Sequence, residues 1–167
     1  MAITLIATAG ATNANTYPTL AEAETYFESR IAIAAWAAAT DPNKNISLSM
    51  ATRLIDQQVL FRGWMYDSDQ SLQWPRRGVM GRTGNYLTDN TIPQFLKDAT
   101  SEYAALLLTE DRTIESGTKG YDRISVADAI YVRFDKYDRK KVMPPSVWSF
   151  LKFYGSRIGA HRRLVRV

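Results

Sequence analysis

One short stretch of the sequence, SLQWPRRGVMGR, combines residue types that could bind nucleic acid. A tryptophan ring offers a flat surface on which a base can stack, and arginines can follow a phosphate backbone. In this interpretation Trp74 or Tyr86 stacks on bases. The phosphate contacts would come from Arg76, Arg77 and Arg82. The first question is whether this stretch contacts a ligand or shapes the fold.

The same stretch also has the composition of a structural loop between packed helices. Trp74 would bury its ring, Pro75 would force a turn, and a following arginine would pair with a nearby acid such as Asp67 or Asp69. These acids interrupt the uniform positive charge that single-stranded nucleic acid requires. Tryptophan and arginine are also common at the energetic centres of protein interfaces. We therefore favour a structural or inter-subunit loop made of Trp74, Pro75, Arg76 and Arg77.

The sequence offers few residues for catalysis or metal binding. It has no cysteine, which excludes disulfides and thiolate ligands, and a single histidine, His161. One histidine argues against both a histidine-based metal cluster and a Ser-His-Asp triad. Glu22, Glu24 and Glu28 are typical of helix-dipole partners and solvated charge. We expect a protein that is not an enzyme and that uses no cofactor and no metal.

Length and composition predict one folded domain. A chain of 167 residues with 46% apolar residues can bury one hydrophobic core. The longest apolar stretch, residues 31–39, is far shorter than the roughly 20 residues of a membrane helix. The N-terminal residues lack the basic leader of a secretory signal. We expect a soluble intracellular protein with a helical domain over residues 1–155 and an extended basic tail over 156–167.

Charge is unevenly distributed along the chain. The formal net charge is +4, yet no acid follows Asp138, and the segment after it holds eight bases. Residues 1–138 hold the other 13 bases against 17 acids. A basic terminal segment can bind nucleic acid, a membrane surface or an acidic protein, and charge alone does not choose among them. A solvated tail is the remaining alternative.

Hydrophobic periodicity predicts a mainly α-helical fold with a small β element. Thr19 and Glu22 form a capping box that opens a helix over residues 19–30. The alanine-rich run around Trp36 continues or restarts this helix, because alanine is the best helix former. We expect the sequence DPNKN to break the helix. Ser47 would then cap a second helix over residues 47–61. The side chains expected to face solvent on this second helix are Arg53, Asp56 and Gln57.

The second half of the chain begins with a long loop over residues 63–90, punctuated by glycines and a proline. A third helix follows, with Pro93 in its first turn, and runs to about Asp111. The segment ISVADAIYVRF predicts one strand or a hairpin. A short helix then starts at Pro144 and Pro145 and is expected to stop at Gly155 as its C-cap.

Six segments, taken in order, carry a resemblance to a known family. They are NTYPTLAEAETYF, ATRLID, SLQWPRRGV, IPQFLKDATSEYA, PPSVWSFLKFYG and RRLVRV. With them the chain resembles the head-tail adaptor proteins of tailed bacteriophages, which are also described as DnaT-like single-stranded-DNA-binding proteins. The resemblance spans nearly the whole chain, and its most distinctive part is the L-x-W-P-R core from Leu72 to Arg76. The charged connector over residues 113–122 departs from the family pattern.

The resemblance implies a mostly helical subunit that forms a ring, commonly of twelve copies, on the portal protein. Such a dodecameric ring extends the DNA channel and receives the next neck or tail component, a stopper or tail terminator. Family members tend to end in a basic, leucine-containing tail that docks on the portal. The residues of this chain that we assign to the docking tail are Arg157, His161, Arg162, Arg163, Leu164, Val165 and Arg166.

We therefore expect a structural head-tail connector in the neck of the virion, present in the host cytoplasm during assembly. Its partners would be the portal, the next neck protein and copies of itself, with genomic DNA only as channel contents and no membrane. Leu164 and Val165 have no core-forming pattern around them, which favours docking over a solvated tail. Contacts repeated around a ring would add up through avidity. The alternative is a single-stranded-DNA-binding, primosome-like protein.

Overall fold

The fold is taken from a computed structural model, which describes residues 3–31, 33–114, 123–126, 130–133 and 141–159. The helices in these residues are α1 (Leu20–Glu28), α2 (Ala34–Ala38), α3 (Asp41–Gln58), α4 (Gln94–Thr109) and α5 (Pro145–Leu151). The strands are β1 (Val59–Phe61), β2 (Trp64–Met65), β3 (Arg76–Arg77), β4 (Arg123–Val126), β5 (Ile130–Arg133) and β6 (Gly155–Arg157). The predicted mainly α-helical fold is confirmed.

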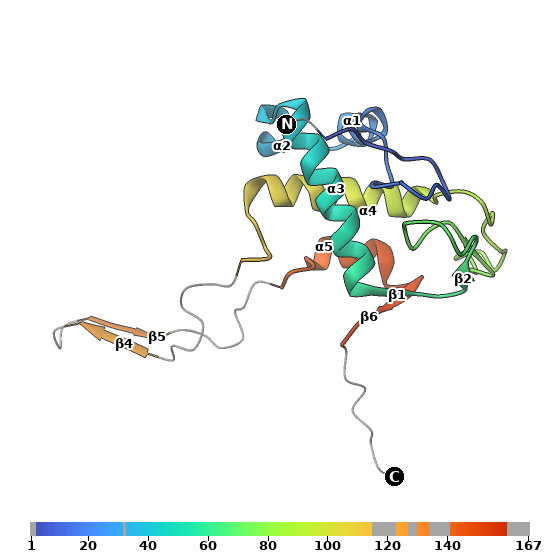
Figure 1. Cartoon of the computed structure of the whole chain (residues 1–167). Coiled ribbons are helices and arrows are strands. Elements are labelled where there is room, and N and C mark those ends of the chain that lie inside the picture. The colour runs from blue at the N-terminus through green and yellow to red at the C-terminus, as the bar shows by residue number, and fades with distance from the viewer. Residues whose placement is uncertain (1–2, 32, 115–122, 127–129, 134–140, 160–167) are drawn as a thin grey trace, which may run out of the picture.

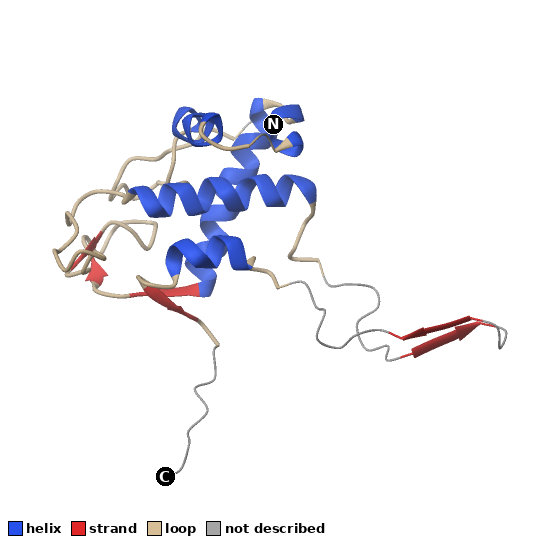
Figure 2. Ribbon diagram, turned by 180° about the vertical axis from the view of Figure 1, so that it is seen from behind, coloured by secondary structure: helices blue, strands red, loops and turns tan. Residues whose placement is uncertain are grey.

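Two long helices, α3 and α4, cross at the centre of the molecule (Figure 1). The short helix α5 packs on α4, and α1 and α2 lie on the opposite side of α4 from α5 (Figures 1 and 2). One core fills the space between these helices, and its largest fully buried side chains include Leu48, Ile55, Leu96, Tyr103 and Leu151. The strands form three antiparallel pairs, β1 with β6, β2 with β3, and β4 with β5.

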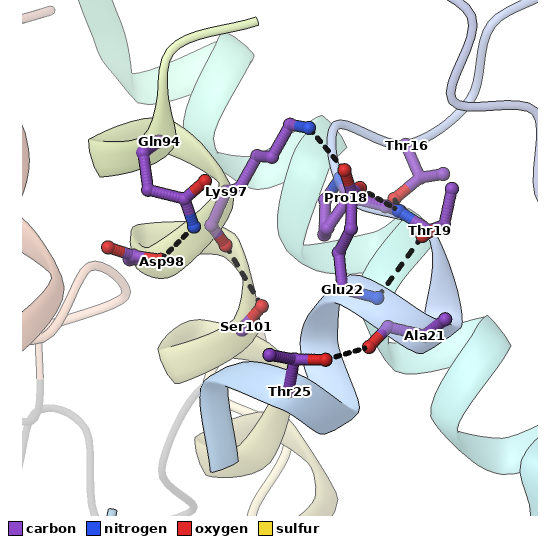
Figure 3. Close-up of polar contacts among 10 residues, drawn as sticks. All are labelled: Thr16, Pro18, Thr19, Ala21, Glu22, Thr25, Gln94, Lys97, Asp98 and Ser101. Carbon is purple, nitrogen blue, oxygen red and sulfur yellow. Dashed lines mark hydrogen bonds and ion pairs between the residues drawn. The ribbon is translucent and has the colours of Figure 1, made fainter. Parts of the chain in front are cut away.

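The first helix begins where the sequence predicts. The Thr19 hydroxyl accepts from the Glu22 N–H at 3.2 Å, and the Glu22 carboxylate accepts from the Thr19 N–H at 2.8 Å, which completes the capping box (Figure 3). Lys97 of α4 forms an ion pair with the same carboxylate (Figure 3). Further along, Arg30 pairs with the buried Glu102 of α4 at 2.9 Å. The first pair holds the N-terminal end of α1 near the N-terminal end of α4, and the second ties the chain just after α1 to the second half of α4.

Helix α3, which corresponds to the predicted helix over residues 47–61, starts six residues earlier than predicted. It begins at Asp41 after the N-cap Thr40, with Pro42 in its first turn, so DPNKN opens the helix and does not break it. Proline is suited to this place because a first-turn N–H has no intrahelical partner in any case. Ser47 is a buried residue inside α3, and its hydroxyl donates to the Lys44 carbonyl at 2.8 Å. The prediction that Ser47 caps the helix is wrong.

The predicted C-cap at Gly155 is also wrong, because α5 already ends at Leu151. Gly155 lies in β6 opposite Phe61, where a Cβ atom would come within 2.7 Å of the Val59 side chain. The first residues assigned to the tail, 156 and 157, therefore lie in a strand of the folded body. The N–H of Ile158 still donates to the carbonyl of Gln58 at 2.9 Å. The other predicted tail residues, His161, Arg162, Arg163, Leu164, Val165 and Arg166, lie outside the described residues.

The predicted β element is a hairpin, in which β4 and β5 pair from Arg123 opposite Arg133 to Val126 opposite Ile130. Figure 1 shows the hairpin away from the five helices. Most of the preceding connector, residues 115–122, lies outside the described part of the chain.

Candidate functional site

The Trp74 side chain lies in the interior of the protein, with 1% of its surface exposed. Its ring makes edge contacts with Phe61 at 5.7 Å and with Phe95 at 5.8 Å between ring centroids. Phe95 in turn stacks on Tyr154, 3.7 Å away. The peptide bond from Trp74 to Pro75 is cis, and Pro75 is buried as well. This arrangement leaves no face of Trp74 on which a base could stack.

Arg76 is a buried cation whose guanidinium group is fixed by oxygen atoms of Gln73 and of the residues at and just after the end of β1. Its Nε donates to the carbonyl of Arg62 at 2.8 Å, and one terminal nitrogen donates to the carbonyl of Gly63 at 2.8 Å and weakly to that of Phe61 at 3.4 Å. The other terminal nitrogen donates to the carbonyl and side-chain oxygens of Gln73 at 3.2 and 2.9 Å. Burial lowers the pKa of Arg76. Arg76 thus clamps the loop onto the end of β1.

Asp56 lies on the inner side of α3, so the prediction that it faces solvent is wrong. Its carboxylate accepts a hydrogen bond from the Tyr17 hydroxyl and one from the Gln73 N–H at 3.0 Å. Burial raises the pKa of Asp56 to about 6, although both hydrogen bonds oppose the shift. Burial and the neighbouring Asp56 raise the pKa of Tyr17 well above its usual value. One carboxylate therefore joins the N-terminal arm, helix α3 and the loop.

Two further side chains bind the loop to its surroundings. The amide of buried Gln70 donates to the carbonyls of Leu72 and Pro75 at 2.7 and 3.0 Å. The Ser71 hydroxyl donates to the carbonyls of Ala11 and Ala14 in the N-terminal arm at 3.2 and 2.6 Å. The middle of the loop is therefore a well-packed part of the domain, held by polar side chains on both sides.

A different part of the loop is exposed and aromatic, and we call it the Trp64 surface. It consists of Trp64, Tyr66, Arg77, Met80 and Tyr86. The guanidinium of Arg77 lies over the Tyr66 ring, 4.3 Å from its centroid. The Trp64 ring covers Gly78, where a Cβ atom would be only 3.0 Å from the indole. Met80 and Tyr86 pair through an isolated β-bridge.

Arg157 is the one member of the predicted set of docking residues that the structure describes, and it lies opposite Val59 in the β1–β6 pair. Its guanidinium lies over the ring of Trp148, 4.8 Å from the centroid. In the described residues the Nε atom of Arg157 is buried without a hydrogen-bond partner.

The structure divides the predicted loop residues into two groups. Trp74, Pro75 and Arg76 lie together in the interior, whereas Arg77 is exposed. The expected ion pair with Asp67 or Asp69 is wrong for Arg76, because that guanidinium bonds to the loop oxygens described above. Trp64 was missed, because it lies outside the distinctive motif and no pattern marks it. Asp56 could have been found from its spacing, since it follows the fully buried Thr52 by one helical turn.

The described residues contain neither a candidate metal-binding cluster nor a candidate membrane-spanning helix. No cluster of three or more histidine, cysteine, aspartate or glutamate residues there could hold a metal ion. None of the described helices is both long and apolar enough to cross a membrane. The features that remain are a loop fixed in the interior and an exposed aromatic surface beside it.

These features define a small, mainly α-helical protein that offers surfaces for binding. Residues 1–167 match the model of the family described as "Putative DnaT-like ssDNA binding protein". The chain belongs to this family. No curated protein and no solved structure matches the chain.

Proposed function

We propose that this protein is a non-enzymatic head-tail adaptor of a tailed phage, which forms a ring on the portal and receives the next neck component. The family description names single-stranded DNA binding, and the adaptor function is the finer assignment that we add to it. The resemblance of the six ordered segments, from NTYPTLAEAETYF to RRLVRV, is the starting point for this assignment.

The β4–β5 hairpin is the observation that carries the proposal. Its strands pair only with each other among the described residues, and Figure 1 shows the hairpin apart from the helices. An isolated two-stranded hairpin is at best marginally stable in water, so it needs a further surface on which to pack. A neighbouring subunit in a ring or the portal would supply that surface.

The interior position of the Trp-Pro-Arg motif supports the same proposal. Within this motif Trp74 and Arg76 are the residues whose types suit base stacking and phosphate binding, and both are buried. Arg76 donates its hydrogen bonds to oxygens of its own chain. Neither side chain is free to hold a nucleotide, which weakens the direct argument for nucleic-acid binding at this motif.

The basic end of the chain is the proposed portal contact, beginning beyond Arg157. Trp148 holds the guanidinium of Arg157 at the edge of the body, next to β1. Arginines here would pair with carboxylates of the portal, and each weak contact would be repeated around the ring. The basic segment would thus bind by avidity and not by one strong contact.

A deletion of residues 160–167 tests the function without cutting into β6. The full chain and the deletion variant would each be mixed with the purified portal protein encoded in the same genome, and with a single-stranded oligonucleotide. We expect portal binding to fall at least tenfold and the melting temperature to stay unchanged. Portal binding that persists unchanged would contradict the docking role of the tail. An absence of any portal binding by the full chain would contradict the adaptor function itself.

Single-stranded DNA binding is the second candidate, and the Trp64 surface favours it. Trp64 and Tyr86 are 64% and 71% exposed, and Arg77 and Arg82 are exposed on the same loop. Bases stack on such rings, and arginines follow the phosphates. The Trp64→Ala variant would then lose oligonucleotide affinity while it keeps portal binding. If the full chain shows no oligonucleotide binding at low salt, where such binding is strongest, this candidate fails.

A further inference from the structure

We propose that the outer edge of strand β6 receives an extended acidic segment of another protein, which pairs with β6 through its main chain as a third strand. The site consists of Gly155, Ser156, Arg157 and Ile158, with Leu60 of β1 beside them, and we call it the β6 edge. This inference goes beyond the proposed adaptor function and does not depend on it. Nucleic acid at the same place is an outcome of the test.

The main-chain groups on one side of β6 have no partner among the described residues. The Ile158 N–H donates to the Gln58 carbonyl at 2.9 Å, so this residue turns its main chain toward β1. Successive residues of an antiparallel pair turn these groups to opposite sides, so those of Gly155 and Arg157 point away from β1. No third strand joins this sheet in the described part of the chain. Figures 1 and 2 show the β1–β6 pair at the margin of the helical body.

The opposite edge of the ladder, on β1, is already occupied. The Val59 N–H donates to the Ile55 carbonyl at the end of α3. The Phe61 carbonyl accepts weakly from the buried Arg76 at 3.4 Å, which ties this edge to the central loop. A further strand can therefore join the ladder at β6 but not at β1. Unpaired main-chain groups at a sheet edge are the groups that an added strand uses.

Apolar side chains lie exposed beside the β6 edge. Leu60 and Ile158 are 64% and 57% exposed. Leu60 lies opposite Ser156, and Ile158 follows Ser156 by two positions, so the three side chains share one face of the ladder. The small Ser156 side chain leaves this face open between the two larger ones. A strand beside β6 would cover the face with apolar side chains of its own.

The segments that build the β6 edge are basic. Residues 57–66 and 141–159, which form the β1–β6 ladder, its flanks and α5, contain no aspartate or glutamate. Their basic residues are Arg62, Lys141, Lys152 and Arg157. An incoming segment with carboxylates would therefore meet complementary charge.

The carboxylates on the neighbouring helices already have partners. Asp98 of α4 accepts a hydrogen bond from Gln94 at 2.8 Å, and Glu102 pairs with Arg30. Asp56 of α3 is bonded in the interior, as described above. These acids leave the charge of the β6 edge to be balanced by a partner.

Arg157 offers a specific contact for one carboxylate. Its guanidinium lies over the Trp148 ring, 4.8 Å from the centroid. Its Nε is buried and has no acceptor among the described residues, although buried donors are normally paired. The residue beside Arg157 in a third strand would lie on the same face of the sheet. A glutamate there would present two oxygens to the guanidinium, which can donate two parallel hydrogen bonds.

Two other occupants fit these charges less well. Pairing of β6 edges from two copies would bring their basic surroundings together, which like charges oppose. The segment after residue 159 carries Arg162, Arg163 and Arg166 and no acid, so its charge is also of the wrong sign. Each of these occupants gives its own result in the experiments below.

A synthetic peptide of alternating glutamate and valine tests the inference on the full chain. Its binding, measured by fluorescence anisotropy, should slow the hydrogen exchange of the Gly155 and Arg157 amides. Two further peptides carry N-methyl groups on every glutamate or on every valine, with unchanged side chains. Because successive N–H groups of a strand point to opposite sides, one methylated peptide should keep its affinity and the other should lose it at least tenfold.

A charge reversal in the protein tests the guanidinium contact. Arg157→Glu should lower the peptide affinity at least tenfold, because it removes the donor and places like charges together. The control is Arg82→Glu, an equal charge reversal on the exposed loop before α4, which should change the affinity by less than about threefold. Urea unfolding of both variants checks that the body stays folded. The methylated peptides use the unchanged protein and test the pairing in any case.

Three results would overturn the inference. They are no peptide binding at low salt, equal affinities of the two methylated peptides, and an unchanged affinity of a folded Arg157→Glu variant. If deletion of residues 160–167 raises the peptide affinity at least tenfold, the end of the chain itself occupies the edge and the inference is wrong.

Two further results would assign the edge to a different occupant. Self-association of the full chain that slows exchange of the same two amides would make it a second copy. Oligonucleotide binding that Arg157→Glu abolishes, without any peptide binding, would make it nucleic acid. The inference is wrong in both cases. A full chain that binds the peptide but no portal contradicts the adaptor function alone.

Discussion

The carboxylate of Asp56 accepts a hydrogen bond from the hydroxyl of Tyr17, 39 positions earlier in the chain. Tyr17 is fully buried, and its backbone N–H also donates to the hydroxyl of Thr52 at 3.3 Å on the same helix. These two bonds fix the N-terminal arm on α3. Because Asp56 also accepts from Gln73, the arm and the central loop depend on the same side chain.

The pH dependence of stability should report the burial of Asp56. Its pKa is raised to about 6 by burial in the folded protein, whereas an unfolded aspartate titrates near about 3.9. Between these values the folded state holds a proton that the unfolded state has released, so the free energy of unfolding falls as the pH rises. This contribution is fully present below about pH 4 and is lost above about pH 6.

Urea unfolding of the wild type and of Asp56→Asn at several pH values between about 4 and 7 measures the effect. The wild-type free energy of unfolding should fall relative to that of the variant by up to about 3 kcal/mol over this interval, since each pKa unit corresponds to about 1.4 kcal/mol. Parallel pH profiles for the two proteins would show that Asp56 does not titrate in this range.

Trp74 and Trp64 offer a matched pair of substitutions. Trp74→Ala removes a fully buried ring and its contacts with Phe61 and Phe95, and should lower the free energy of unfolding by about 3–5 kcal/mol. Trp64→Ala acts on an exposed ring and should change stability by less than about 1 kcal/mol. Chemical denaturation of both variants distinguishes the two environments. Equal losses would contradict the interior position of Trp74.

The neighbouring arginines form a second matched pair. Arg76→Ala leaves the carbonyls of Arg62 and Gly63 without their donor, and should cost at least about 2 kcal/mol of folding free energy. Arg76→Lys should recover little of this free energy, because an ammonium group cannot replace the planar guanidinium group and its several donors. Arg77→Ala removes only an exposed contact with Tyr66, expected to contribute about 0.5–1 kcal/mol. Thermal melting of the three variants gives the comparison, and a stable Arg76→Ala protein would be inconsistent with the clamp.

Gly155 should tolerate no side chain. A Cβ atom there would meet the Val59 side chain at 2.7 Å and the Leu60 carbonyl oxygen at 2.8 Å, so Gly155→Ala should force β6 away from β1 and cost about 1–3 kcal/mol. Ser156→Ala, at the next and exposed position, is the control and should be nearly neutral. The Arg62 N–H donates to the Tyr154 carbonyl, next to the Phe61–Gly155 pair. Its hydrogen-exchange rate should rise in Gly155→Ala and stay unchanged in Ser156→Ala.

Local patterns were enough to predict much of the helical fold. The capping box of α1 lies within four residues, and the apolar periodicity of α4 marks a helix whatever surrounds it. The start of α3 was missed because DPNKN has turn composition, although proline and aspartate also suit a first helical turn. Composition alone does not separate these two uses of proline.

Contacts between residues far apart in the chain could not be predicted from the sequence. The inward position of Asp56, one turn after the buried Thr52, is explained by its partners Tyr17 and Gln73. Nothing in the sequence next to Asp56 indicates these partners. In the same way Gly155 is needed because β1 lies against it, far away along the chain. The roles assigned to residues 161–166 stay predictions, since these residues lie outside the described part of the chain.

The pairing of β6 with β1 has a mechanical consequence. Because β1 follows α3 without a break, a tensile force applied at the C-terminus reaches the central helix through the hydrogen bonds of this ladder. Without the ladder the same force would pull directly on the seven-residue helix α5 and peel it from α4. The fold therefore lets the end of the chain bear load while the packing of α5 is spared.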